Sequence, residues 1–294
     1  MSGGKKVTKV FKRVYPFYFL IPAGIFYILL FLVPTAVSFF FSLTRWSLMD
    51  WSFIGLDNFV TFFKEPWLYT GLQNTMIFAI LTSGLKVVFG LLLGVFLCSR
   101  IKSGEFIKSL VFFPVLVSTI AVGITFENLM HPSNGIINGF LAWFGLKGPN
   151  LLGDPDLALV SVALVDVWKG IGIATVIFIA GIKSIPEEYS EALQIDGGNA
   201  WHKFWNIIIP LSRPAMNTVI MLSLIGGLKT FDLIWAMTKG GPGFSTDTIA
   251  SIIFKQYQAG FYGLSTAGNV ILFLIVILIV MPLMKLLTRN EVEM

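Results

Sequence analysis

The sequence has few of the residues from which metal, redox and hydrolytic centres are built. Among 294 residues it has one cysteine, Cys98, and two histidines, His131 and His202. One cysteine excludes a disulfide within the chain and any CxxC zinc or redox site, and the two histidines lack a zinc-ligand spacing. The chain has no GxxxxGK[ST] phosphate loop and no GxSxG or HExxH motif. The sequence therefore predicts no catalytic residue, no bound metal and no bound cofactor.

Charged residues are also scarce. They make up 13% of the chain, against roughly 25% in soluble globular proteins, while 55% of the residues are hydrophobic. Residues 14–44 and 256–284 contain no Asp, Glu, Lys or Arg. Because a helix needs about 20 apolar residues to cross a bilayer, this composition predicts a polytopic membrane protein. The net charge of +5 does not indicate a nucleic-acid partner, since the basic residues gather beside the predicted spans.

The apolar segments predict an all-α fold with six transmembrane helices in a single transmembrane domain, residues 14–294. The first and last spans lack charge, whereas the middle four carry isolated polar or charged residues. The predicted spans cover about 17–43, 71–98, 109–129, 157–182, 214–238 and 263–287.

The orientation of these spans follows from the Lys and Arg residues beside them. Thirteen lie on one side of the predicted membrane and five on the other. The thirteen are Lys5, Lys6, Lys9, Lys12, Arg13, Arg100, Lys102, Lys108, Lys183, Lys203, Arg213, Lys285 and Arg289, and the five are Arg45, Lys64, Lys147, Lys239 and Lys255. Since cytoplasmic loops carry the excess of positive charge, both termini are expected inside, with residues 1–13 as a basic cytoplasmic tail.

Three smaller patterns complete the layout. Apolar residues recur at helical spacing in 56–65, which predicts a short helix there. Residues 130–156 are rich in Gly, Pro and Asn and are expected to be irregular. Gly90 and Gly94, separated by three leucines, have the small-xxx-small spacing that lets two membrane helices approach closely, although chance in a glycine-rich chain explains it equally well.

The loop between the fourth and fifth predicted spans is longer than a reversal needs and is patterned as two helices. Ser184 and Glu187 have the spacing of a capping box, in which each side chain hydrogen-bonds the backbone of the other. The first helix is therefore expected to begin here. It would run to about Asp196 and stop at Gly197-Gly198, because glycine adopts a positive φ without strain.

The second half of this loop predicts another helix. Apolar residues recur there at i, i+3, i+4 and i+7. They are Trp201, Phe204, Trp205 and Ile208. Pro210 is expected to close this helix, and Pro214 suits the first turn of the following span.

The first helix of the loop is acidic on the side of the membrane where Lys and Arg normally dominate. Its acidic residues are Glu187, Glu188, Glu191 and Asp196. A helix that lies on anionic lipid would be basic, so an acidic helix indicates a protein partner with a basic groove. A solvated hairpin without a partner explains this pattern alone equally well.

The same loop resembles a known family. Glu191-Ala192-Leu193, then Gly197, then Ile207-x-Ile209-Pro210 is similar to the EAA loop of ABC importer permeases (EAA, three residues, Gly, nine residues, I-x-L-P). Leu193 stands in place of the second Ala and Ile209 in place of Leu, and both remain apolar. Other segments resemble the carbohydrate-uptake permeases of the maltose type. They are Tyr15-Pro16, Ser42-x-Thr44-x-Trp46, Gly55-Leu56-x-Asn58-Phe59, Asn74-Thr75 and Thr238-Lys-Gly-Gly-Pro242.

This resemblance implies a permease subunit in a prokaryotic cytoplasmic membrane. Its partners would be a second related permease, two copies of an ABC ATPase that hold ATP and Mg²⁺, and an extracytoplasmic solute-binding protein. Within the loop, Glu191 would bond to an Arg or Lys of the ATPase, Ala192 would keep the approach close and Gly197 would supply the turn. The helix at 201–208 would rest the hairpin on the membrane domain.

Two predicted spans carry an acidic and a basic residue three positions apart, with an aromatic residue between them. The sets are Asp166, Trp168 and Lys169, and Lys229, Phe231 and Asp232. Such charges can neutralise each other on a helix, and an aromatic face beside hydrogen-bonding groups suits a sugar ring. The resemblance places the solute path along these spans. The alternative is a structural ion pair between two permeases; Lys86 is expected to be structural or to extend toward the membrane surface.

Other functions fit less of the sequence. A secondary transporter or channel would also have six spans with buried charges, but it would not need an acidic, partner-shaped hairpin. An intramembrane enzyme could use Asp166 and Asp232 as a dyad, but each has a lysine three residues away that would quench it. A structural scaffold is less favoured still. An ABC permease for a non-sugar solute stays open, because amino-acid and phosphate permeases also carry the EAA loop.

Overall fold

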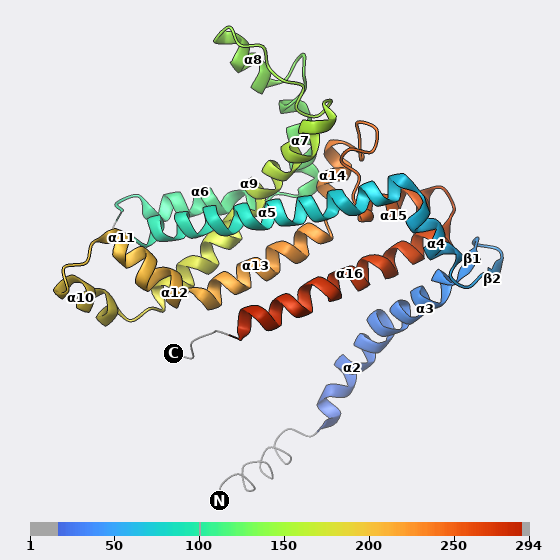
Figure 1. Cartoon of the computed structure of the whole chain (residues 1–294), viewed down its shortest axis with the longest axis horizontal. Helices are drawn as coiled ribbons and strands as arrows, with labels where there is room; N and C mark the ends of the chain where they lie inside the picture. Colours follow the sequence, from blue (N-terminus) through green and yellow to red (C-terminus); the bar gives the residue numbers. More distant parts are fainter. Residues whose placement is uncertain (1–16, 100, 290–294) are drawn as a thin grey trace, which may run out of the picture.

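The computed structural model describes residues 17–99 and 101–289, which form a bundle of helices with one small β-hairpin (Figure 1). The hairpin pairs β1 (Thr44–Trp46) with β2 (Trp51–Phe53) in antiparallel register, with Arg45 opposite Ser52. The predicted basic tail and Arg100 lie outside the described residues. The prediction of a helical membrane protein is confirmed for the described part of the chain.

Four helical stretches are long and apolar enough to cross a membrane, and the described chain has up to six candidate spans if each of two bent pairs is one span. The pairs are Gly104–Leu116 with Thr119–Leu129 and Ala200–Leu211 with Arg213–Leu228, the second bent by 67°. The four are Tyr18–Ser42, α5 (Pro66–Cys98), α9 (Pro155–Lys183) and α16 (Tyr262–Thr288). The first stretch consists of the 3₁₀ turn Phe17–Leu20, α2 (Ile21–Tyr27), the π-helical turn Ile28–Leu32 and α3 (Val33–Ser42). These four stretches correspond to the helices predicted over 17–43, 71–98, 157–182 and 263–287.

The predicted continuous helix over 109–129 is wrong. Instead, α6 (Gly104–Leu116) and α7 (Thr119–Leu129) meet at a bend of 98°. The backbone of Val117 is extended, and α7 turns away to pack on α14 (Asp232–Met237). Gly123 makes this packing possible, because a Cβ at that position would lie 2.4 Å from the Cβ of Ala236. A contact with a distant segment therefore decides where the span bends.

The predicted continuous helix over 214–238 is also wrong. It is divided into α13 (Arg213–Leu228) and α14, and residues 229–231 between them are not helical. The carbonyl of Thr230, which has left the helix, accepts a hydrogen bond from Thr248 Oγ1 at 3.2 Å. A side chain at the start of α15 (Ile249–Gln258) thus satisfies a backbone group released at the break, as an interrupted membrane helix requires. Pro214 lies in the first turn of α13, as predicted.

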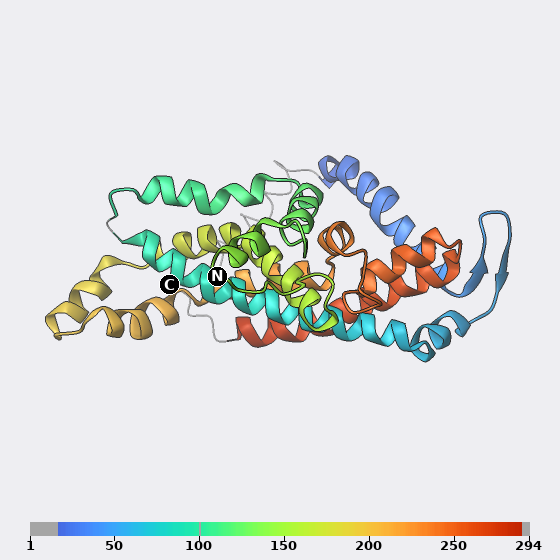
Figure 2. The same ribbon diagram turned by 90° about the horizontal axis from the view of Figure 1, so that it is seen from above.

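Helix α5 is the centre of the bundle and packs on α9 and α13 (Figure 2). Gly90 and Gly94 face α9, where Cβ atoms added to them would lie 2.8 Å from the Cβ atoms of Ala174 and Phe178. The small-xxx-small spacing therefore serves close helix packing and is not a chance feature. On the other side, Gly227 of α13 lies against Ala79.

We expect Gly94→Ala to destabilise the bundle and Gly84→Ala to stabilise it. Both residues lie in α5, but a Cβ at Gly84 would meet no atom within 4 Å. Alanine in an open helix position gains about 0.5–1 kcal/mol over glycine, whereas overpacking costs about 1–3 kcal/mol. The melting temperatures of the purified variants should therefore move in opposite directions. A rise in both would show that α5 and α9 accommodate the extra Cβ without cost, and a fall in both would show that Gly84 is not an open position.

Several shorter helices lie outside the candidate spans. Helix α4 (Asp57–Lys64) confirms the short helix predicted over 56–65. Residues 130–156, predicted to be irregular, contain α8 (Ile136–Trp143), which projects sideways from the bundle (Figure 1). Helix α15 (Ile249–Gln258) was not predicted, although its first six residues include five apolar ones.

The loop before α15 is fixed to the bundle by buried polar side chains. Asn74 of α5 donates hydrogen bonds from Nδ2 to the carbonyls of Phe244, Ser245 and Asp247 at 2.9–3.2 Å. The buried carboxylate of Asp247 accepts bonds from Ser251 Oγ and Lys255 Nζ, both at 2.7 Å. Burial raises the pKa of Asp247 above its ordinary value, although Lys255 and Ser251 oppose this shift.

A raised pKa means that the Asp247 carboxyl binds its proton more tightly in the folded state than in the unfolded state. Its contribution to stability is therefore full at acid pH and is lost as the pH rises through the folded-state pKa. Asparagine does not titrate, so Asp247→Asn should not lose stability in this way. We expect the difference between the melting temperature of Asp247→Asn and that of the native chain to increase from about pH 4, near the ordinary Asp pKa, to neutral pH. A difference that falls over this range would contradict the assignment.

Candidate functional sites

The loop between α9 and α13 forms a helical hairpin at one end of the bundle, opposite the β-hairpin (Figures 1 and 2). Its first helix is α10 (Glu187–Ile195). The second arm consists of α11 (Ala200–Lys203), the π-helical turn Phe204–Ile208 and α12 (Ile209–Leu211). We call residues 187–211 the end hairpin.

Glycines close α10 as predicted. Gly197 has φ +74°, and its N–H donates to the Gln194 carbonyl at 3.1 Å. The N–H of Gly198 donates to the Leu193 carbonyl at 2.8 Å. This pair of bonds is a Schellman motif, which satisfies the last carbonyls of a helix and requires a left-handed residue after it. The turn between the two arms is therefore rigid.

The capping box predicted at the start of α10 is wrong. Ser184 Oγ donates to the Gly181 carbonyl at 2.8 Å, and α10 begins at Glu187 after Pro186, with no side-chain cap. Helix α9 extends to Lys183, and Ser184 is the C-terminal cap of α9 rather than the N-terminal cap of α10. A different capping box lies at α11, where Asn199 Oδ1 accepts from the N–H of His202 and His202 Nδ1 accepts from the N–H of Asn199. The Asn-x-x-His spacing is the sequence feature that could have predicted this capping box.

The second arm differs from the expected amphipathic helix. Ile207 and Ile208, which lie within the π-helical turn, are both buried. Trp201 and Trp205 are 67% and 49% exposed. Ile208 packs with Phe178 and Val219 in an apolar cluster between α9 and α13. Pro210 does not close the arm, because α12 continues to Leu211.

The residues of the EAA-like segment lie on the outside of the hairpin. No residue of α10 is buried, and Glu191, Ala192, Asp196 and Gly197 are exposed. Leu193 is half-buried, and a Cβ at Gly198 would lie 2.5 Å from its Cδ1. An exposed acidic helix that ends in a rigid turn offers carboxylates to a partner without moving.

The charges predicted to pair within a span do not do so. Asp166 of α9 forms an ion pair with Lys86 of α5 at 2.5 Å, rather than with Lys169. The two side chains are 22% and 11% exposed. Among the described residues, Lys169 makes no ion pair. Lys86 is thus structural, which was one of the two roles expected for it. Trp168 packs on Phe126 of α7, with ring centroids 5.1 Å apart.

The second predicted set lies at the break of the fifth span. Lys229 caps α13, Asp232 begins α14, and both are exposed. No ion pair joins them in the part of the chain that the structure describes. Phe231 between them stacks on Trp235 and contacts Phe254 of α15, with centroid distances of 5.7 and 4.9 Å. The expected i, i+3 pair is absent because the helix is interrupted between its two members.

Two serines that the sequence did not single out lie beside the ion pair. Ser83 of α5 and Ser223 of α13 are buried and hydrogen-bonded at 2.8 Å. Ser223 and Lys86 line a cavity of about 120 Å³ between α5, α9 and α13. An isolated serine in an apolar span gives no periodic signal, so only the packing identifies this polar contact.

The described residues contain no group of three or more His, Cys, Asp or Glu side chains arranged to hold a metal ion. Residues 86–291, which include α9, the end hairpin and α13, match the family of binding-protein-dependent transport system inner membrane components. The chain belongs to this family. It is therefore a permease of the inner membrane and a transport subunit rather than an enzyme.

Two relatives and one solved structure illustrate the similarity. A trehalose/maltose transport system permease protein of Thermococcus litoralis is 30% identical over 84% of this permease and 84% of its own length. An sn-glycerol-3-phosphate transport system permease protein of Pectobacterium atrosepticum is 30% identical over 89% and 90%. A chain of a bacterial alginate ABC transporter, solved with an alginate pentasaccharide-bound periplasmic protein, has the same fold, with a TM-score of 0.82 over 94% of each chain at 22% identity.

Proposed function

We propose that this permease forms the membrane path of an ATP-driven carbohydrate importer together with a second, related permease. Two copies of an ABC ATPase hold ATP and Mg²⁺, and an extracytoplasmic solute-binding protein delivers the sugar or oligosaccharide. Both termini and the end hairpin face the cytoplasm. The single domain 14–294 contains the six spans. The observation that carries this proposal is the exposed acidic α10, closed by a Schellman turn at one end of the bundle.

The end hairpin couples ATP hydrolysis to the spans. Glu191 accepts a charge-assisted hydrogen bond from an Arg or Lys of the ATPase, and Ala192 lets the ATPase surface approach closely. Gly197 fixes the angle between the arms, and Asp196 lies at the start of that turn. The buried Ile208 transmits the motion to α9 and α13, against which it packs. Pro210 and Leu193 complete the shape of the coupling loop.

The solute passes beside the breaks in the third and fifth spans. Interrupted helices are tolerated at membrane depth where they line a cavity or lie in protein, and transporters place their binding sites at such interruptions. Lys229, Phe231 and Asp232 lie at one break, and Trp168 contacts α7 just beyond the other. Lys169 makes no ion pair among the described residues, whereas Asp166 is held by Lys86. The aromatic rings bind the C–H faces of the sugar, and the charged groups bind its hydroxyls.

Purification from native membranes in mild detergent, followed by mass spectrometry, tests this assignment. An ATPase and a second permease should be recovered with the tagged chain. ATP hydrolysis by the complex should rise with the binding protein and a sugar, for which maltose and trehalose are the first probes. Stimulation by sn-glycerol 3-phosphate alone would establish a non-sugar solute. Repeated recovery of this chain alone would contradict the importer and favour a self-sufficient secondary transporter.

A further inference from the structure

Helix α8 and the loops on either side of it form an arm between α7 and α9 that projects sideways from the bundle (Figure 1). We call residues 130–153 the side arm. Its large apolar side chains include five that are 57–81% exposed: Ile136, Phe140, Trp143, Phe144 and Leu146. The first three of these recur at i, i+4 and i+7, which places them on one face of α8. The side arm therefore carries an exposed face that is apolar and mainly aromatic.

The other side of α8 fixes the side arm to the bundle. Ile137 packs against the apolar cluster that joins α7, α9 and α14. Asn138 is buried, and its Nδ2 donates to the carbonyls of Pro132 and Pro149 at 3.1 and 3.2 Å. Gly148 lies so close to it that a Cβ there would be 2.2 Å from Asn138 Oδ1. Because the side arm is braced in this way, its exposed face keeps a fixed direction.

The side arm has few polar groups with which to bind a protein. His131 Nδ1 accepts from the N–H groups of Ser133 and Asn134 at 3.3 Å, and Asn150 Oδ1 accepts from the N–H of Gly153 at 3.0 Å. These side chains thus bond to the backbone of the side arm itself. Lys147 is the one Asp, Glu, Lys or Arg in residues 130–153. A protein interface usually surrounds its apolar centre with a polar rim, which this face lacks.

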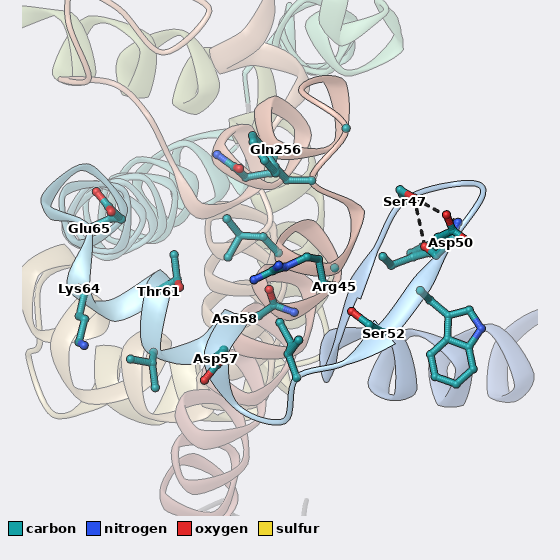
Figure 3. Close-up of a pocket in the computed structure, with 18 of the residues that line it drawn as sticks. Arg45, Ser47, Asp50, Ser52, Asp57, Asn58, Thr61, Lys64, Glu65 and Gln256 are labelled. Atoms are coloured by element: carbon teal, nitrogen blue, oxygen red, sulfur yellow. Dashed lines mark hydrogen bonds between the residues drawn. The ribbon is translucent and has the colours of Figure 1, made fainter.

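An exposed surface elsewhere on the molecule has the opposite composition. An open groove of about 1100 Å³ beside the β-hairpin is lined by Arg45 of β1 and by Asp57 and Lys64 of α4 (Figure 3). In the described chain, these three residues make no ion pair. Unpaired charges are costly in hydrocarbon, so the groove belongs in water. A face of Trp, Phe and Ile beside a single lysine is instead typical of the boundary between membrane and water.

We propose that the side arm is a lipid anchor, with the apolar face of α8 at the boundary between the headgroups and acyl chains of the outer leaflet. Contact with lipid requires only that this permease lies in the membrane. The choice of leaflet rests on the proposed function, since α9 runs from the side arm to the end hairpin. Phe140 and Ile136 contact acyl chains, Trp143 lies at the level of the headgroups, and Lys147 binds a lipid phosphate.

The anchor has a consequence for the broken fifth span. The cluster against which Ile137 packs includes Leu233 and Ile234 of α14, directly after the break. A lipid contact on one side of α8 and this cluster on the other therefore hold the break at a fixed depth in the membrane.

A bimane label on Phe140→Cys reports which medium covers the exposed face. The label is placed in a Cys98→Ser background, because Cys98 is the one cysteine of the chain. The assembled transporter is reconstituted in vesicles of phosphatidylethanolamine and phosphatidylglycerol. Ala142→Cys is the matched control, since it is exposed on the same helix but lies about 200° around it from Phe140. Phospholipid with a nitroxide near the start of its acyl chain should quench the label at 140 about threefold more than the label at 142, and aqueous iodide should do the reverse.

A label on Phe144→Cys, one turn further along the same face, should repeat the result and detects a local distortion at position 140. Stronger quenching by iodide at both positions would place this face in water and overturn the inference. Weak quenching by both reagents would show that a protein covers the face, and would overturn it equally. Normal nitroxide quenching without sugar-stimulated ATP hydrolysis in the same vesicles would instead contradict the proposed function and leave the lipid contact intact.

Discussion

Glu191→Lys is expected to abolish ATP-driven uptake while the transporter still assembles in the membrane. Glu191 is exposed and has no hydrogen-bond or ion-pair partner within the described chain, so its replacement leaves the fold unchanged. Reversal of its charge against a basic group of the ATPase costs about 2–5 kcal/mol of the contact, which corresponds to a loss of roughly 30-fold or more. Uptake of labelled sugar by reconstituted vesicles, measured beside ATP hydrolysis, checks this result.

Glu105→Lys provides the matched control. Glu105 is also exposed and lies in the first turn of α6, where it pairs with Lys108 on the surface. An exposed pair of this kind contributes little to stability because solvent screens it, so uptake should be nearly normal. Gly197→Pro tests the turn itself: proline fixes φ near −65°, whereas Gly197 needs +74°. If Glu191→Lys and Gly197→Pro both transport at the native rate, the end hairpin does not couple the ATPase to the spans.

The end hairpin was predictable because its features are local in the sequence. Gly197 and Gly198 end α10 through hydrogen bonds to residues three and five positions earlier, and the acidic composition of this short helix already indicates that it is exposed. The start of α10 was mispredicted for a related reason. Ser184 could cap α10 or end α9, and the continuous apolar pattern of α9 took precedence.

The breaks in the third and fifth spans could not be predicted from apolar periodicity. The fifth predicted span breaks at Lys229-Thr230-Phe231, just before Asp232, whereas the signal for the bend in the third span lies in tertiary contacts between α7 and α14, which meet at Gly123 and Ala236. The same holds for the ion pair. The lysine three residues from Asp166 was the nearest in sequence, but the packing of α5 on α9 brings Lys86 closer, 80 residues away. Periodicity identified the membrane helices, whereas their interruptions and pairings depend on the assembled bundle.

The second large effect is expected at this ion pair. Lys86→Met leaves the Asp166 carboxylate without its partner in an interface where the side chain is 22% exposed. Removal of one member of a buried pair costs about 3–5 kcal/mol, whereas replacement of both members by apolar residues of similar volume is often neutral or stabilising. The melting temperature of Lys86→Met should therefore fall sharply. The double variant Lys86→Met/Asp166→Leu should recover most of the loss.

The sequence left open a structural ion pair between two permeases, whereas Asp166 pairs with Lys86 within this chain. The double variant decides whether Asp166 has a role beyond joining α9 to α5. If the pair only joins α5 to α9, the stable double variant transports sugar at close to the native rate. If Asp166 contributes to the solute path, the double variant is stable but transports poorly, because an apolar side chain cannot bind sugar hydroxyls. Trp168→Ala is the companion measurement, and its melting temperature is measured as well because the Trp168 ring packs on Phe126. Loss of transport in Trp168→Ala but not in the double variant would assign the path to the aromatic residues and leave the ion pair as a structural contact between α5 and α9.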